Sequence, residues 1–323
     1  MKAAADPNRL RILRVLGNGP FHVAELTEIL GLGQSTVSRH LRLLAEAGLV
    51  DVRRSGTWAF YSRRVHAAAG GRAADIFPPQ LLALLDASWD GGGPDAASVE
   101  RVLRKRRRAT SAFFRDAASD WDRLRDRTLG PPQHVDRLLE LVGDAGTVVD
   151  LGTGTGVLLP RLARSSARVI GIDASPEMLE LAQRRVEEAA LPRTDLRLGR
   201  LEHLPLSDGE ADTMIANLVL HHVADPREVL REIRRGLAEG GRLLIADLEE
   251  RDDEAFWKAL GARWPGFRPK EVEEWLDAAG FRSVRTETPA ADRAALHGEE
   301  NNGGRPGVFL IAATNPPSRR RNA

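Results

Sequence analysis

The front of the chain alternates apolar runs of helical period with glycine-rich turns. Apolar spacing predicts helices over Asn8–Leu16 and Val23–Leu30 and over about Gln34–Ala47. Leu49–Arg54 and Thr57–Ser62 flank a Ser-Gly turn, which predicts a β-hairpin. Two short helices, a tight turn, a third helix with a polar outer face and a hairpin together indicate a winged helix-turn-helix.

The back of the chain shows a different pattern, in which strand-length apolar runs alternate with amphipathic stretches. These runs are Val148–Leu151, Arg168–Ile172, Leu196–Leu198, Thr213–Asn217 and Leu243–Asp247. Such alternation predicts an α/β fold with a parallel sheet and helices on both faces. Arg282–Thr288 and Gly307–Thr314 have no helix-length pattern between them, so we expect an antiparallel pair at one edge. We also expect the helix before the fifth strand to end at Gly240-Gly241.

Turn residues divide the chain into segments. Asp90–Pro94 is a flexible break, and Gly130–Pro132 stops a helix. The expected parts are a DNA-binding and dimerisation domain (1–89), a linker and helical connector (90–130), an α/β domain (131–315) and a disordered tail (316–323). A chain of 323 residues is long enough for two domains.

Composition and charge narrow the class of protein. Residues 1–89 carry 11 basic and 7 acidic side chains, residues 90–130 carry 10 and 7, and residues 131–323 carry 26 and 32. A basic front suggests a polyanionic partner. No apolar run has the length of a membrane span. The absence of cysteine excludes disulfides, zinc-thiolate sites and thiol nucleophiles, and it fits a cytoplasmic protein without a metal site.

The third helix of the front domain carries short hydroxyl, amide and cationic side chains, the types that reach base edges in a major groove. Arginines of the hairpin suit phosphates. We predict DNA contacts from Gln34, Ser35, Thr36, Ser38, Arg39, His40, Arg53 and Arg54. Arg101–Arg108, with six basic residues in eight, is either an extension of this footprint or a solvated helix face.

This front segment closely resembles the winged-helix repressors of the ArsR/SmtB type over about its first 65 residues. The resemblance implies a homodimer on palindromic operator DNA, with Ala73–Leu85 available for the dimer interface. Well-known members of the family sense metals through cysteines, which this chain lacks.

The stretch TVVDLGTGTG (147–156) places a carboxylate and three alternating glycines directly after a strand. Because position 157 is valine, the dinucleotide pattern GxGxxG is not met, and no lysine is present to pair with a polyphosphate. Asp150 would repel pyrophosphate but suits the ammonium and sulfonium of S-adenosylmethionine. Asp173, at the end of the next strand, suits ribose hydroxyls, as in any adenosine-binding α/β fold.

The motifs VDLGTGTG, GIDASPEML, LEHLPLSDGEAD, NLVLHHV and LAEGGRLLIADL resemble those of class I S-adenosylmethionine-dependent methyltransferases, in that family's order. The family implies a Rossmann-like domain and S-adenosylmethionine as cofactor. Where many relatives have an acidic residue next to an alanine, this chain has Arg200-Leu201. The implied cofactor residues are Asp150, Gly152, Gly154, Gly156, Asp173, Ala174, Leu201, Glu202 and Asn217, with Phe114 and Trp121 from the connector.

Methyl transfer requires alignment, and it requires a base only when the nucleophile arrives protonated. His221 and His222 follow the fourth strand at the ligand-binding end of such sheets and are the catalytic candidates, with packing as the alternative. Phe114 and Trp121 either line the pocket or dock a helix on the core. The aromatic group Trp257, Trp264, Phe267 and Trp275 is either helix packing or a cap over the acceptor.

The combined hypothesis is a DNA-binding regulator with a methyltransferase domain that methylates a small-molecule acceptor. The alternative is a repressor whose methyltransferase-like domain only senses S-adenosylmethionine or S-adenosylhomocysteine. Both use the same cofactor residues, so the sequence leaves them open.

Overall fold

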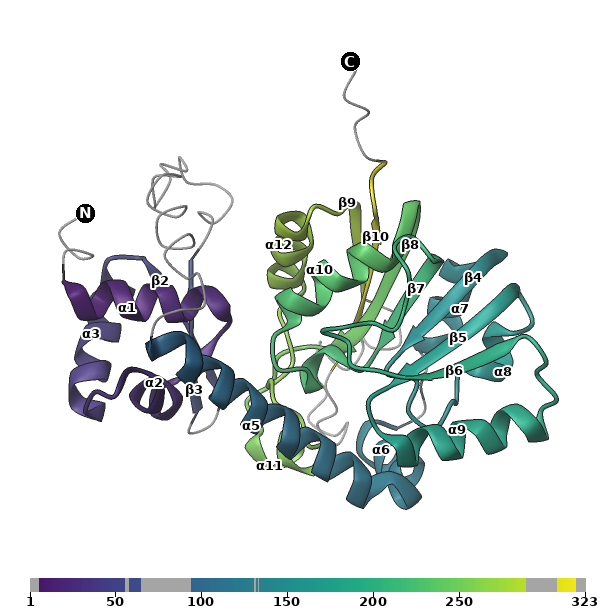
Figure 1. The fold of residues 1–323 in the computed structure, drawn as a ribbon, viewed down its shortest axis with the longest axis horizontal. Coiled ribbons are helices and arrows are strands. Elements are labelled where there is room, and N and C mark those ends of the chain that lie inside the picture. The colour runs from purple at the N-terminus through teal and green to yellow at the C-terminus, as the bar shows by residue number, and fades with distance from the viewer. Residues whose placement is uncertain are drawn as a thin grey trace, which may run out of the picture. The chain divides into compact units, whose positions relative to one another are not determined.

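A computed structural model of the chain describes residues 6–55, 58–64, 94–130, 132, 134–288 and 307–317 (Figure 1). The chain divides into two compact units, Met1–Arg108 and Ala109–Ala323. Their boundary falls inside helix α5 (Pro94–Ala117), whereas the sequence suggested breaks near residues 90 and 130. The expected dimer helix, Ala73–Leu85, lies outside the described residues, as do residues 318–323 of the expected tail.

The first unit has the predicted helices and hairpin. Its elements are α1 (Pro7–Val15), β1 (Phe21–His22), α2 (Val23–Leu30), α3 (Gln34–Glu46), β2 (Val50–Ser55) and β3 (Trp58–Arg63). The three strands form a small antiparallel sheet in the order β1-β3-β2. Ile12, Leu26 and Leu41 are fully buried, so the three helices share one core. The sequence did not predict strand β1, because two residues are too few to show an alternation of apolar and polar positions.

The N-terminal part of α5 belongs to this first unit and is fastened to α2. Arg106 Nε donates to Glu25 Oε1 at 2.7 Å, and its guanidinium lies 4.8 Å from the ring centroid of Phe21. Glu25 also closes the capping box of α2 with His22. Arg106 is only 6% exposed, so one member of the basic run is neither a DNA contact nor a solvated residue but a structural one.

The second unit is built on a seven-stranded sheet in the order β6-β5-β4-β7-β8-β10-β9. The strands are β4 (Ala145–Leu151), β5 (Ser166–Asp173), β6 (Thr194–Leu198), β7 (Ala211–Asn217), β8 (Leu237–Leu248), β9 (Arg282–Glu287) and β10 (Val308–Thr314). The first five run parallel, and β10 pairs antiparallel with both β8 and β9. The predicted α/β sheet with an antiparallel edge is therefore confirmed.

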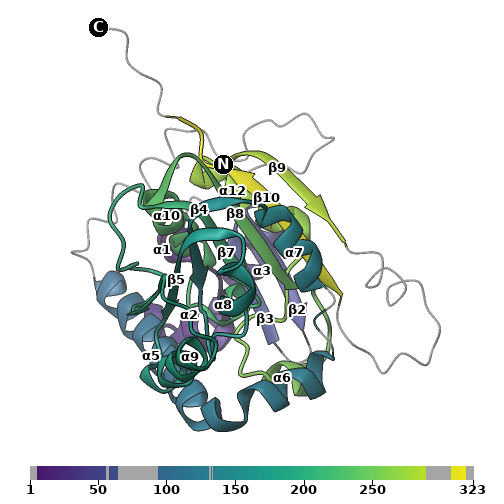
Figure 2. The same cartoon turned by 90° about the vertical axis from the view of Figure 1, so that its right-hand side faces the viewer.

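Helices cover both faces of this sheet. They are α6 (Trp121–Leu129), α7 (His134–Val142), α8 (Leu159–Leu162), α9 (Pro176–Glu188), α10 (Pro226–Gly236), α11 (Glu254–Ala259) and α12 (Pro269–Ala279). Apolar residues of α7, α8 and α9 share one core cluster with the strands. Figure 2 shows α7 and α10 on opposite sides of the sheet. In the described parts of the chain, no helix is long and apolar enough to cross a membrane.

One local expectation was wrong. Helix α10 ends at Gly236, and the chain is already extended from Leu237, six residues before the expected strand start at Leu243. Gly236 packs closely against β7, since a Cβ there would lie 2.7 Å from Met214 Cε. Helix α8 has a single turn and ends at Leu162. The late aromatic group packs inside the unit, because all four of its side chains are at most 7% exposed, namely Trp257, Trp264, Phe267 and Trp275.

Candidate functional site

The N-terminal half of α3 presents the expected polar surface in the first unit. Gln34, Ser35 and Arg39 are exposed, and Thr36 and Ser38 are partly exposed.

Two of the predicted DNA-contacting side chains are withdrawn from solvent. His40 is 4% exposed, with Nδ1 4.0 Å from Asp6 Oδ1 at the start of α1. Arg53 is 8% exposed on β2. The side chain of Arg54 lies outside the described residues. The surface that can meet DNA is therefore narrower than the sequence indicated, because a helical period cannot tell how far α1 covers α3.

The glycine loop in the second unit follows β4, and its three glycines have different surroundings. All three have positive φ, at +67° for Gly152, +54° for Gly154 and +77° for Gly156. A Cβ on Gly152 would lie 2.4 Å from Val219 Cγ2, and one on Gly156 would lie 2.8 Å from Leu159 Cδ1. A Cβ on Gly154 would meet nothing closer than 4.0 Å. Internal packing thus explains the outer two glycines, whereas the middle one borders open space that a ligand can enter.

Two carboxylates flank this loop, and both are short of compensating charge. Asp150 is 2% exposed, and its only described side-chain donor is the Thr153 hydroxyl at 2.7 Å. Burial raises the pKa of Asp150 to about 6. Asp173 accepts the backbone N–H groups of Gly154 at 2.8 Å and Ser175 at 2.9 Å, and burial raises its pKa as well. Each group would gain from a ligand that brings a cation or hydroxyl donors.

Asn217 is the last residue of β7, and its side chain is held by a hydrogen bond from His134 of α7. Its Oδ1 accepts a hydrogen bond from Nε2 of His134 at 2.9 Å, and burial lowers the pKa of this histidine, which keeps it neutral. The next residue, Leu218, has φ +54°, and its N–H donates to the Ala246 carbonyl at 2.7 Å. A leucine in the left-handed region is strained, and such strain concentrates at functional sites.

The edge of the site beyond Asp173 contains a residue that the sequence analysis missed. Leu198 ends β6, pairs in register with Asp173 and is 60% exposed. An exposed leucine beside the partly exposed Asp173 offers an apolar face to a flat ring. Ala174 is exposed nearby, while Leu201 and Glu202 are only 7% and 8% exposed. Any contact from these last two therefore depends on the backbone more than on the side chains.

Helix α6 is tied to the glycine loop by a polar network. The Thr155 hydroxyl donates to Asp122 Oδ1 at 2.8 Å. Arg185 of α9 donates to Asp122 Oδ2 at 3.1 Å and to the Thr155 carbonyl at 2.8 Å. Because Trp121 precedes Asp122 in the chain, the network also holds the backbone at Trp121 close to the glycine loop.

Trp121 and Phe114 meet His222 edge to face. The ring centroid of Phe114 lies 5.0 Å from that of Trp121 and 4.7 Å from that of His222. His222 Nδ1 donates to the Gly261 carbonyl at 3.4 Å, which leaves the lone pair on Nε2. That Nε2 atom is buried and has no hydrogen-bond partner among the described residues. Burial, with a further contribution from His221, holds the pKa of His222 well below its ordinary value, so the ring is neutral.

His221 points toward a different partner. Its Nδ1 lies 2.6 Å from Oδ1 of Asp247, and the two side chains are 2% and 0% exposed. Asp247 is fixed by the backbone N–H groups of Leu220 at 2.9 Å and Leu248 at 2.7 Å. Asp247 was predicted only as the end of a strand, although an acidic residue at the carboxyl end of a parallel strand is itself a signal of a functional site.

Comparison with known proteins identifies both units. Residues 4–53 match the family model of a helix-turn-helix domain, and residues 149–245 match that of a methyltransferase domain. The second match spans the glycine loop, both carboxylates, Asn217 and the two histidines.

Curated relatives that cover about half of this chain agree with the second match. An uncharacterised methyltransferase of Mycobacterium tuberculosis is 36% identical over 47% of this chain and 58% of its own length. The ubiquinone biosynthesis O-methyltransferase of a Methylobacterium species is 30% identical over 58% of this chain and 69% of its own length. The phosphoethanolamine N-methyltransferase 2 of Haemonchus contortus, solved with S-adenosylhomocysteine, shares the fold at 15% identity. Its TM-score is 0.52 over 64% of this chain and 60% of that one. The first curated relatives are matched over 33% to 58% of their own length.

Proposed function

The chain belongs to the methyltransferase family, and we propose that it is a DNA-binding regulator that methylates a hydroxyl group of a small-molecule acceptor. S-adenosylmethionine is the cofactor of the methyltransferase domain. When bound, it supplies an activated methyl group on a cationic sulfur. The rest of the proposal concerns what this chain's residues do around it.

The glycine-loop end of the sheet fits this cofactor. Asp150 is a buried carboxylate with no described cation beside it, which suits the ammonium group of the methionine moiety. Asp173 retains acceptor capacity for ribose hydroxyls beyond its two backbone donors. Leu198 offers an apolar face for adenine, with the Ala174 and Leu201–Glu202 backbones at its edge. The open space at Gly154 lets the ligand approach the backbone.

The His221–Asp247 pair is the observation that favours catalysis over sensing. A sensor needs the glycine loop and the carboxylates, but it does not need a proton acceptor. Because Nδ1 of His221 faces Asp247, its proton lies on that side and Nε2 carries the lone pair. Asp247 would stabilise the imidazolium that forms when Nε2 takes a proton from an acceptor hydroxyl, as the carboxylate does in other acid–base pairs.

Next to this pair lies an aromatic cluster, defined as Phe114, Trp121 and His222. The cluster supports the proposal that the methyl acceptor binds here. The centroids of the two histidine rings are 4.1 Å apart. Buried polar atoms are normally paired, so the orphan Nε2 of His222 calls for a donor such as a ligand O–H group. We assign His221 as the base and His222 as a hydrogen-bond acceptor to the bound molecule.

Methyl transfer tests the enzymatic part of the proposal. The full chain is incubated with S-adenosylmethionine labelled on the methyl group and with a panel of phenols, catechols and sugar alcohols, and labelled product is measured. We expect transfer to at least one hydroxyl compound, and a His221→Gln chain that binds S-adenosylhomocysteine normally but loses transfer. Normal binding of S-adenosylhomocysteine with transfer to none of the panel would favour the sensor instead.

DNA binding is proposed for the exposed face of α3, namely Gln34, Ser35, Thr36, Ser38 and Arg39. A basic first segment and the helix-turn-helix match support it. Selection of duplexes from a random pool by the full chain, followed by a mobility shift with and without S-adenosylmethionine, tests both DNA recognition and its coupling to the cofactor. Failure to enrich any sequence would contradict the regulatory part.

A further inference from the structure

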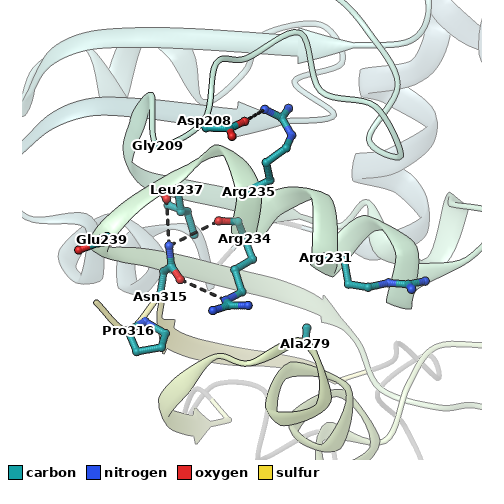
Figure 3. Close-up of a pocket in the computed structure, with 10 residues that line it drawn as sticks. All are labelled: Asp208, Gly209, Arg231, Arg234, Arg235, Leu237, Glu239, Ala279, Asn315 and Pro316. Carbon is teal, nitrogen blue, oxygen red and sulfur yellow. Dashed lines mark hydrogen bonds and ion pairs between the residues drawn. The ribbon is translucent and has the colours of Figure 1, made fainter. Parts of the chain in front are cut away.

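A cavity lies at the opposite end of the sheet from the glycine loop. It has a volume of about 520 Å³ and is lined by the last turns of α10, the loop before β7, the start of β8, the last residue of α12 and the segment after β10 (Figure 3). These segments mark the amino ends of β7 and β8, whereas Gly154 and Asp173 lie at the carboxyl ends of their strands. The cavity is thus separate from the cofactor site, and its volume is that of a site for a small organic molecule.

Three arginines of α10 line this cavity, and one of them has a purely structural role. Arg235 uses all five of its N–H donors. Nε donates to Glu232 at 3.0 Å. Nη1 donates to Asp208 at 2.7 Å and to the Leu206 carbonyl at 2.8 Å. Nη2 donates to Glu232 at 2.7 Å and to the Leu204 carbonyl at 3.2 Å. A guanidinium carries five donors, so Arg235 has none left for a ligand.

The other two arginines, Arg231 and Arg234, each use only one of their N–H donors. Arg234 donates only through Nε, to Asn315 Oδ1 at 3.3 Å, and Arg231 donates only through Nε, to the Arg227 carbonyl at 3.4 Å. Within the part of the chain that the structure describes, neither guanidinium forms a salt bridge, and neither has a hydrogen-bond partner for its Nη atoms; the charge of Arg231 does act on the Glu228 carboxyl, where it opposes the rise in pKa caused by burial. Both side chains are exposed at the cavity. Figure 3 shows them on either side of Ala279.

Arg234 is also held in position. Asn315 is 6% exposed, and its Nδ2 donates to the carbonyls of Leu237 at 2.9 Å and Ala238 at 3.1 Å, which aims Oδ1 at Arg234. A Cβ on Gly280 would lie 3.0 Å from Arg234 Cζ, so this glycine leaves room for the guanidinium at the C-terminus of α12. The helix end favours a cation there, but it leaves both Nη groups available.

The charge of the lining is positive once internal pairs are removed. Asp208 is engaged by Arg235. Figure 3 shows the remaining acidic residue, Glu239, beyond Asn315 and away from Arg231. Arg234 lies beside Asn315, and Arg231 lies at the rim with its guanidinium directed outward (Figure 3). Guanidinium groups that form no salt bridge match carboxylate or phosphate oxygens. We propose that this cavity binds a small organic anion with two or more carboxylate or phosphate groups, held by Arg231 and Arg234.

Isothermal titration of the full chain with sodium citrate and with sodium pyrophosphate, at ionic strength matched with sodium chloride, tests this site. We expect saturable binding of at least one probe, weakened at least tenfold in Arg231→Gln/Arg234→Gln. Arg184→Gln is the matched control, because Arg184 is an exposed arginine of α9 and should bind the probe like the unaltered chain.

The thermal midpoint and the affinity for S-adenosylhomocysteine of each variant verify folding. If the double variant fails these checks, the single Arg231→Gln variant carries the test, since Arg231 bonds only to its own helix. The proposal is overturned if neither probe binds saturably, or if the arginine variants bind as tightly as the Arg184→Gln control. Binding that survives in the double variant would place the anion elsewhere on the chain.

Discussion

Nδ1 of His221 and Oδ1 of Asp247 lie 2.6 Å apart, with both side chains almost completely buried. The two residues come from neighbouring strands of the sheet, since His221 follows β7 and Asp247 lies near the end of β8. Two backbone N–H groups fix the carboxylate, so the imidazole is oriented by a group that cannot itself rotate. A buried imidazole oriented in this way suits the proton removal proposed above for a hydroxyl acceptor.

Replacement of Asp247 by asparagine should remove imidazolium stabilisation while the volume stays the same. We expect kcat for a hydroxyl acceptor to fall by about 10²-fold or more, with little change in the Kd for S-adenosylhomocysteine. The loss should shrink for acidic phenols, which ionise without help. Initial rates across phenols of graded acidity, measured at fixed pH, check this. An equal loss for all acceptors would indicate a structural role for Asp247.

The affinity for the cofactor should depend on pH through the ionisation of the Asp150 carboxyl. Burial raises its pKa to about 6 in the folded chain, so the carboxyl is neutral below that pH and ionised above it. Affinity for S-adenosylhomocysteine should therefore rise as pH increases through about 6, because its ammonium group pairs with the ionised form. 5′-Methylthioadenosine lacks the amino acid moiety and is the matched control. Similar pH profiles for both ligands would contradict the assignment of Asp150.

The same group predicts a trade-off between stability and binding. A carboxyl with a raised pKa binds more protons in the folded than in the unfolded chain, so its contribution to stability is lost as pH rises through about 6. Asp150→Asn should therefore raise the free energy of unfolding at pH 8, by up to about 3 kcal/mol, and weaken S-adenosylhomocysteine binding. Urea titrations at pH 4 and pH 8 measure the first effect, which should be fully present at pH 8, about half as large at pH 5 and small at pH 4, because the carboxyl is then mostly protonated in both states.

The glycines of the loop should separate into packing and binding positions. Gly156→Ala places a methyl group 2.8 Å from Leu159 Cδ1 and should cost about 1–3 kcal/mol of stability. Gly154→Ala meets no neighbour, so it should cost only the roughly 1 kcal/mol of the positive φ while weakening cofactor binding. Melting curves and calorimetric titration of both variants make the comparison. Equal effects on affinity would remove the distinction.

The Arg106–Glu25 pair should matter for the first unit. Arg106 is 6% exposed, and Arg106→Met would leave the Glu25 carboxylate buried without its cation. The hydrogen bonds from Arg106 hold the pKa of Glu25 low against the opposing effect of burial. We expect a loss of about 3 kcal/mol, partly recovered in Glu25→Gln/Arg106→Met. Hydrogen exchange of α2 amides in the full chain reads out this unit, and an unchanged exchange rate would count against the structural role.

Exposed and buried residues of α3 should respond differently to substitution: exposed ones should affect DNA binding, and buried ones should affect stability. Arg39→Ala should weaken binding to a selected duplex by about 1–3 kcal/mol and affect random DNA less. His40→Ala, at a 4% exposed position, should instead lower the melting temperature and leave the sequence preference unchanged. Competition binding with both variants measures this. An equal loss of affinity for selected and random DNA would indicate that Arg39 contacts only phosphate.

Local patterns in the sequence determined the order of elements and the kind of chemistry. The helical period gave α1, α2 and α3 within two residues, and strand-length runs gave the parallel sheet and its antiparallel edge. Asp150, Asp173 and the glycines were found because their roles depend on chain spacing after a strand. The ligand class followed from the same residues, since a carboxylate before the loop disfavours phosphate.

Only the tertiary structure decided which side chains meet. Asp247 joins His221 across 26 positions of sequence, Arg106 joins Glu25 across 81, and Asp122 joins Thr155 across 33. Burial of His40 and Arg53 likewise depends on neighbouring elements. A hydrophobic period reports one face of one element, whereas pairing and burial result from how elements pack. The sequence therefore placed the glycine loop and its two carboxylates, and only the fold brought His221 and Asp247 together.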